Sequence, residues 1–238
     1  REVTPLDDGF TLTSSTNTSG YVSAGTTASL FTNAYSSSGT LSLTSTKALS
    51  TLISNDNSNY VPGDYVPMES ELFQFKLVPA TSNAPMPQNA EVIYGYNAST
   101  NIIASIDFGS VNISSNMLAD GVGQWQYYVT EVIPDDAVNE DGIRYIDATD
   151  DEKAAGGFTK DGIIYDGRTS TLVLVARDSG NGVIIKEELP STGPSFINYF
   201  SGELVIEKNV DLTGGFSSNA ADGTYYFSVL DSNGQALE

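Results

Sequence analysis

The stretch Gln124–Pro134, QWQYYVTEVIP, places one carboxylate among six large apolar or aromatic residues. Because side chains alternate across a β-strand, Tyr127, Val129, Glu131 and Ile133 face the same side of the expected sheet. An acid buried among apolar side chains is costly unless it has a partner. The segment therefore predicts a core strand, and it leaves two interpretations of Glu131: an ordinary acid on a wet face, or a buried acid with a specific role.

Similar alternating runs recur along the chain between clusters of Gly, Asn, Asp, Ser and Pro, a pattern typical of an all-β protein. The chain has 238 residues, of which 39% are hydrophobic, so it can bury a substantial core. One short helix is expected at 147–155. The expected strands are 40–47, 72–78, 102–108, 125–133, 170–177, 182–187, 195–200, 203–210 and 224–230.

The charge balance excludes several classes of function. With 30 acidic against 10 basic residues, the net charge of -20 repels nucleic acids and anionic membranes.

Histidine and cysteine are both absent, which removes Ser-His and Cys-His nucleophile pairs, the common zinc sites and disulfide bonds. No apolar run approaches the roughly 20 residues of a membrane span. We expect no cofactor, no metal, no nucleic-acid partner and no membrane insertion.

The composition divides the chain into three parts. Residues 1–39 are rich in Ser, Thr, Gly and Asn, and they are interpreted as a linker, a stalk or extra strands. Residues 40–201 are expected to form one β-sandwich. Residues 203–238 are too few for a second sandwich, which usually takes around 100 residues, so we expect the opening strands of an incomplete second domain. The chain is thus expected to be an excised piece of a longer protein.

Strand alternation places two more polar side chains on apolar faces. In LSLTSTK (41–47), Lys47 shares a face with both leucines, and in SFINYF (195–200), Asn198 shares a face with both phenylalanines. Lys76, in contrast, alternates against apolar neighbours and is expected to face solvent. Lys47, Glu131 and Asn198 are therefore three candidates for burial on three separate strands.

A lysine, an asparagine and an acid that are buried together can react. Desolvation lowers the pKa of the amine and raises that of the acid, which gives a neutral nucleophile and an un-ionised group able to polarise the asparagine carbonyl. Attack by the amine releases ammonia and leaves an amide bond between Lys47 and Asn198, while Glu131 moves protons and is unchanged. This is self-modification without turnover, not enzyme activity. An exposed lysine, an edge asparagine and a solvent-facing acid remain the plain alternatives.

Six short motifs follow one another in an order that resembles the amino-terminal isopeptide domain of streptococcal-type Gram-positive major pilins. The likeness covers roughly Leu41 to Asn198. The motifs are LTSTK (43–47), FQFKLVP (73–79), APMP (84–87), WQYYVTE (125–131), YDGRTSTLVLVA (165–176) and FIN (196–198).

This resemblance implies an immunoglobulin-like β-sandwich of the pilin (Cna-B) type with a Lys47–Asn198 isopeptide bond assisted by Glu131. It also implies a structural module of a pilus or stalk, extracellular and attached to the cell wall, with neighbouring pilin or adhesin domains as partners. By the same likeness, Lys208 would be the crosslink lysine of the next domain.

The sequence departs from the pilin pattern before the closing asparagine. Pilins carry a lysine there that sortase uses to join subunits, whereas here the nearest lysine is Lys186, the possible intersubunit lysine. The pentapeptide LPSTG (189–193) matches a sorting signal but lacks the apolar span and basic tail, so no sorting role is expected. The alternative function is the ligand-binding region of a surface adhesin, with residues 1–39 or 134–162 contacting a glycan or matrix protein.

The sequence contains two other candidate binding sites, an acidic one and an aromatic one. The acidic clusters at 133–141 and 147–152 lack the spacing of a calcium loop and are expected to be solvated. Trp125, Tyr127 and Tyr128 are predicted to pack in the core instead of forming a platform for sugars.

Overall fold

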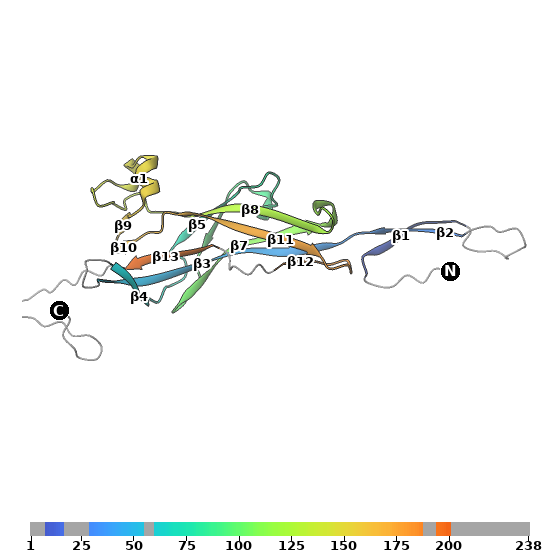
Figure 1. The fold of residues 1–238 in the computed structure, drawn as a ribbon, viewed down its shortest axis with the longest axis horizontal. Coiled ribbons are helices and arrows are strands. Elements are labelled where there is room, and N and C mark those ends of the chain that lie inside the picture. Colours follow the sequence, from blue (N-terminus) through green and yellow to red (C-terminus); the bar gives the residue numbers. More distant parts are fainter. Residues whose placement is uncertain (1–7, 17–28, 55–59, 188–193, 201–238) are drawn as a thin grey trace, which may run out of the picture. The chain divides into compact units, whose positions relative to one another are not determined.

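The computed structural model describes residues 8–16, 29–54, 60–187 and 194–200 (Figure 1). The chain divides into two units, Arg1–Gly202 and Glu203–Glu238, and all described residues belong to the first. The strands expected at 203–210 and 224–230, the LPSTG pentapeptide and Lys208 lie outside the described residues.

The described part is mostly β-structure, as predicted, and every strand expected between 40 and 200 is present: the strand at 195–200 has the predicted ends, and the others have shifted ends. The predicted helix is shorter than expected, α1 (Asp150–Ala155), and three 3-10 turns accompany it: η1 (Pro87–Asn89), η2 (Ser115–Met117) and η3 (Tyr145–Asp147). The strands are β1 (Phe10–Thr16), β2 (Leu30–Tyr35), β3 (Ser38–Ser54), β4 (Tyr60–Tyr65), β5 (Gln74–Pro79), β6 (Ile93–Tyr96), β7 (Ile103–Ser114), β8 (Val122–Glu131), β9 (Thr159–Lys160), β10 (Ile163–Ile164), β11 (Thr169–Asp178), β12 (Ile184–Lys186) and β13 (Ser195–Phe200).

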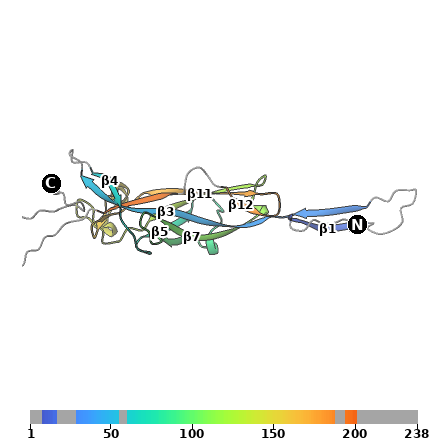
Figure 2. The same ribbon diagram turned by 90° about the horizontal axis from the view of Figure 1, so that it is seen from below.

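The first sheet is built around the long strand β3, which can be followed in Figure 2 from beside β4 to the side of β12. Its order is β4-β3-β13-β10-β9, and β7 also pairs with β3. Strands β7 and β4 pair with β3 in antiparallel fashion, whereas β13 pairs with it in parallel, with Phe196 opposite Lys47. The opening and closing strands of the sandwich are therefore neighbours.

The second sheet has the order β12-β11-β8-β5-β6, and all its pairs are antiparallel. Burial alternates along β8, so that Trp125, Tyr127, Val129 and Glu131 point inward as predicted. The apolar faces of the two sheets pack together in one core, which confirms the predicted β-sandwich. From the first sheet this core takes Leu41, Leu43, Ile106, Val111, Ile113 and Phe196, and from the second Phe75, Leu77, Tyr127, Val129, Leu172 and Leu174.

One predicted core residue lies outside. Tyr128 is 47% exposed because Tyr127 and Val129 take the inward positions on either side of it. The prediction that all three aromatic residues of β8 pack in the core is therefore wrong for Tyr128, although it is confirmed for Trp125 and Tyr127. Lys76 is exposed, as predicted.

The Ser/Thr-rich amino-terminal segment contains strands, one of the three possibilities that the composition left open. Strands β1 and β2 form an antiparallel two-stranded sheet. The hydroxyls of Tyr35 and Ser37 donate hydrogen bonds to the two carboxylate oxygens of Asp178, at 2.6 and 2.7 Å. These bonds lower the pKa of Asp178 and tie the start of β3 to the end of β11.

The long segment between β8 and β10 forms a small core of its own. Ile133, Ala137, Ala148 and Phe158 are buried together. Helix α1 within it begins with a capping box, in which the Thr149 and Glu152 side chains each accept a hydrogen bond from the other residue's main chain. The segment predicted at 134–162 as an insertion is thus a folded part of the described chain.

A buried asparagine side chain adds hydrogen bonds to the main chain just before β5. Asn97 is 1% exposed. Its side-chain oxygen accepts from the Phe73 N–H at 2.7 Å, and its nitrogen donates to the carbonyls of Glu69 and Ala98 at 2.7 and 3.0 Å. One buried main-chain N–H and two part-buried carbonyls therefore depend on one side chain.

We expect Asn97→Ala to lower the free energy of unfolding by about 3 kcal/mol, because it leaves the buried Phe73 N–H unpaired and removes two further hydrogen bonds. The matched control is Asn112→Ala, which removes only an exposed contact with Thr40 and should change the stability by less than about 0.5 kcal/mol. Urea denaturation measures both variants. Equal stabilities for the two would contradict the role assigned to Asn97.

Candidate functional site

The three side chains singled out by strand alternation meet in the core. The amine Nζ of Lys47, on β3, lies 3.0 Å from Oε2 of Glu131, at the end of β8. The carboxamide Nδ2 of Asn198, on β13, donates to Oε1 of Glu131 at 2.7 Å. Exposure is 0% for Lys47, 2% for Glu131 and 0% for Asn198. One carboxyl group from the second sheet thus contacts two neighbouring strands of the first.

Strand register explains this meeting. In the parallel pair β3–β13, Phe196 lies opposite Lys47, and Asn198 follows two residues later on the same face. Glu131 lies opposite Phe75 on the facing sheet and is the last residue of β8, so its side chain crosses the sandwich. The alternation of each strand, and not proximity in sequence, brings the three groups together.

Aromatic rings surround the amine and exclude water. The Nζ of Lys47 is 4.6 Å from the centre of the Phe73 ring and 5.5 Å from that of Phe75. The Phe75 and Phe196 rings pack with their centres 5.1 Å apart. These contacts make the immediate environment of Lys47 apolar apart from its carboxyl partner.

Burial disfavours the charged form of both ionisable groups. It lowers the pKa of Lys47 to about 8, although the nearby Glu131 opposes this change. It raises the pKa of Glu131, although Lys47, Asn198 and the Asp166 N–H oppose it. Moving a proton from the ammonium to the carboxylate is therefore much easier here than in water, and it gives a neutral amine beside an un-ionised acid.

A main-chain group that sequence reasoning missed completes the site. The N–H of Asp166 donates to Oδ1 of Asn198 at 2.8 Å and lies 3.2 Å from Oε2 of Glu131. The sequence led us to expect Glu131 at the asparagine carbonyl, but this carboxyl contacts the carboxamide nitrogen, and the carbonyl oxygen is bound by Asp166. The YD pair in the fifth motif was the only signal, because a main-chain donor is not encoded by residue type.

Of the other two candidate lysines, the described residues include only Lys186. Lys186, on β12, donates from Nζ to the Ser42 carbonyl at 3.3 Å and contacts none of the three core residues. Lys208 lies outside the described residues. Across the described ranges, no group of three or more acidic side chains is arranged to hold a metal ion.

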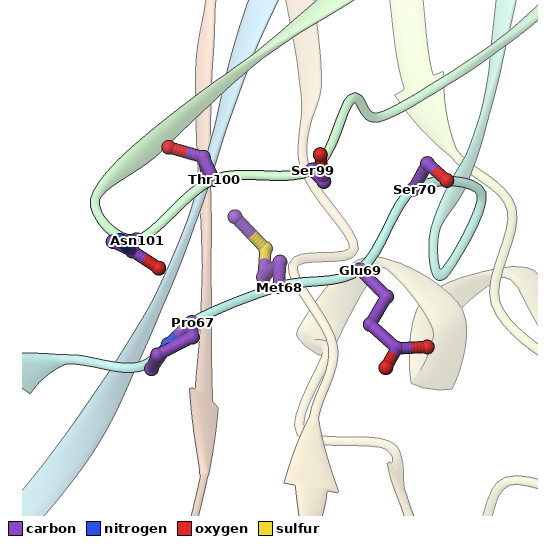
Figure 3. Close-up of a pocket in the computed structure, with 7 residues that line it drawn as sticks. All are labelled: Pro67, Met68, Glu69, Ser70, Ser99, Thr100 and Asn101. Atoms are coloured by element: carbon purple, nitrogen blue, oxygen red, sulfur yellow. The ribbon is translucent and has the colours of Figure 1, made fainter.

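A surface pocket lies between residues 67–70 and 99–101, and Figure 3 shows these two segments facing each other with Met68 between them. The main chains of Met68 and Thr100 exchange two hydrogen bonds, of 2.8 and 2.9 Å, beneath this opening. None of the residues that line it belongs to the Lys47–Glu131–Asn198 group. The Lys47–Glu131–Asn198 group is buried and separate from this pocket.

Comparison with known protein families agrees with the geometry. The family model FctA, described as a Spy0128-like isopeptide containing domain, matches residues 43–201, about two thirds of the chain. This range includes Lys47, Glu131 and Asn198. A comparison with curated proteins found no match.

The family indicates a structural role in an extracellular pilus or other surface protein, and pilin domains typically link to other pilin subunits. None of the helices in the described part of the chain has the length and hydrophobicity of a membrane span. By its sequence match and its β-sandwich, the chain belongs to the family of Spy0128-like isopeptide-containing, pilin-like domains.

Proposed function

We propose that Lys47 and Asn198 join in an intramolecular amide bond, and that this crosslink stiffens a module of a Gram-positive pilus or stalk anchored to the cell wall. One observation carries the proposal. The two oxygens of Glu131 contact the two nitrogens that exchange places in such a reaction, the incoming amine of Lys47 and the departing carboxamide of Asn198.

The groups that exchange bonds and protons in the reaction are these three side chains. The neutral Nζ of Lys47 attacks Cγ of Asn198, a new C–N bond forms, and the carbonyl electron pair moves onto Oδ1. Un-ionised Glu131 gives its proton to the departing nitrogen, and the carboxylate so formed then takes a proton from the attacking nitrogen. The old C–N bond then breaks and ammonia leaves. Glu131 ends unchanged, but the amine and the carboxamide are consumed, so each molecule reacts once.

Such a bond would stabilise the domain and transmit force through it. It would close a loop of about 150 residues and restrict the unfolded chain by about 5 kcal/mol, if the expression for disulfides is applied. Because β3 and β13 are adjacent and parallel, tension entering along one would pass directly to the other. The strands between them in sequence would then carry little load, which suits a pilus or stalk.

Subunit joining is proposed at Lys186. This lysine is on β12, at one edge of the second sheet, and its amine contacts a carbonyl oxygen instead of a buried acid. It is therefore available to an enzyme that transfers an acyl group to a lysine. Binding of a glycan or matrix protein through the amino-terminal segment or through residues 134–162 stays a prediction.

Intact-mass spectrometry tests the crosslink. The unmutated chain should be lighter than its calculated mass by one ammonia, whereas Lys47→Ala, Glu131→Gln and Asn198→Ala should each have the calculated mass and a markedly lower melting temperature. Lys76→Ala, which removes an exposed amine from β5, should keep the deficit. A calculated mass for the unmutated chain would refute the chemistry, and a deficit of two ammonias would reveal a second crosslink.

The protonation states can be followed in Asn198→Ala, where Lys47 remains free. Titration of ¹⁵N-labelled lysines by NMR should place Lys47 at a pKa of about 8 because burial destabilises its ammonium form. The fraction of neutral, nucleophilic amine should therefore rise as the pH increases through about 8. Lys160, which pairs with Asp136, should titrate above the usual lysine value. A Lys47 amine that titrates together with Lys160 would contradict the dry site.

Sortase-dependent polymerisation tests the joining site. In cells that express the parent protein and its sortase, we expect high-molecular-weight ladders that disappear with Lys186→Ala. Lys160→Ala removes another surface amine and should leave the ladders intact. Ladders that persist in Lys186→Ala would rule out this lysine as the acceptor.

A further inference from the structure

We propose that Asp166 takes part in the crosslinking reaction in two ways. Its main-chain N–H acts as a catalytic donor that stabilises the negative charge formed on Oδ1 of Asn198. Its carboxylate, held by Arg168, acts as a positioning group that fixes strand β13 so that Asn198 stays within reach of Lys47. This inference rests on the proposed crosslink and extends it to residues outside the three reacting side chains.

The main-chain donor is placed where charge develops. Attack on Cγ of Asn198 moves an electron pair onto Oδ1, and the Asp166 N–H already lies 2.8 Å from that atom. Fixed donors at this distance stabilise an oxyanion strongly because they need no reorganisation during the reaction. The same N–H is also near Oε2 of Glu131, at 3.2 Å. Once that oxygen has taken the proton from Lys47, it becomes a weaker acceptor and leaves the N–H to the oxyanion.

The carboxylate of Asp166 holds the strand that carries Asn198. Its Oδ2 accepts from the N–H of Ile197, the residue immediately before Asn198, at 3.2 Å. The Asp166 side chain is only 5% exposed, so solvent scarcely competes for this contact. The direction of the Asn198 side chain is therefore fixed by a contact on its own strand, next to the reacting group.

Arg168 holds this carboxylate in place from the solvent side. Its Nε and Nη2 donate to the two oxygens of Asp166 at 2.7 and 2.6 Å, a bidentate pair, and Nη2 also approaches the Ser195 carbonyl on β13 at 3.4 Å. Burial alone would raise the pKa of Asp166, but the hydrogen bonds from Arg168 and Ile197 hold it below the usual value. The positioning group therefore stays ionised while the neighbouring Glu131 becomes protonated.

The turn between β10 and β11 is what lets one residue supply both contacts. The N–H of Tyr165 donates to the Phe158 carbonyl at 3.0 Å, which holds the main chain on one side of Asp166. On the other side, the Arg168 N–H donates to Oδ1 of Asp166 at 3.2 Å and closes a tight turn. The N–H and the carboxylate of Asp166 therefore both reach β13.

The rate of crosslinking in newly made full-length chain tests the proposal. A cell-free translation reaction is stopped after a short pulse, and intact-mass spectrometry follows the fraction of chain that has lost one ammonia. We expect Asp166→Ala to slow this loss at least about tenfold, since small displacements of reacting groups have effects of this size. Arg168→Gln should also slow it, and Arg168→Lys should restore part of the rate.

Two further substitutions separate the roles. Arg177→Gln breaks another arginine–carboxylate pair, near the far end of β11, in which Nε and Nη2 both donate to Oε2 of Glu187; this variant should react at the unmutated rate. Incorporating the α-hydroxy acid analogue of aspartate at position 166 in the same translation replaces only the N–H by oxygen. Because it removes a donor to the oxyanion and keeps the carboxylate, it should slow the reaction about a hundredfold.

The melting temperature of each variant is measured separately in the Glu131→Gln background, where no bond is expected to form. Crosslinking rates are then compared only between variants whose melting temperatures in that background are equal. Unchanged rates for Asp166→Ala and the ester would overturn this inference and leave the crosslink proposal intact. If Asp166→Ala does not fold, an unchanged rate for Arg168→Gln overturns the positioning role. Equal slowing by Arg177→Gln would also overturn it. An unmutated chain that never loses ammonia would overturn both proposals.

Discussion

The buried contact between the Lys47 amine and the Glu131 carboxyl is the constraint on which the rest of the site depends. Two opposite charges removed from water gain less from each other than they lose in hydration, so an ion pair in this position contributes little to stability. Aromatic rings on the strands around the amine keep that cost high. The ion pair in the unreacted core is therefore unfavourable. The reaction would remove both charges, because the amine becomes a neutral amide and Glu131 keeps the proton that came from the ammonium group.

The sequence predicted those parts of the site that follow from alternation along a strand. Lys47, Glu131 and Asn198 each share a face with large apolar residues, and a side-chain period of two sends such a face into the core of a sandwich. Alternation does not predict that the three side chains meet at one point. That meeting depends on the pairing of β3 with β13 and on the packing of β8 from the facing sheet. Those are long-range relations, and the order of the family motifs supplied them where local pattern did not.

The features that escaped prediction share a physical cause. Strands β9 and β10 have two residues each, too short to show any period, and β6 is interrupted by a glycine. Tyr128 looks like a core residue by type, yet its parity on β8 places it outside. Asp166 contacts Asn198 through its main-chain N–H, which every residue but proline possesses, so its residue type did not identify this contact.

The parallel pairing of β3 and β13 has a consequence for the order of events during folding. These two strands lie far apart in the chain, so their contact closes only after the intervening strands have collapsed, when most of the entropy of the loop has already been lost. A chain with misplaced strands cannot bring Asn198 to Lys47. The covalent bond would thus form only in correctly folded molecules and would make their folding irreversible. Incorrectly folded molecules would stay uncrosslinked and could still unfold or be degraded.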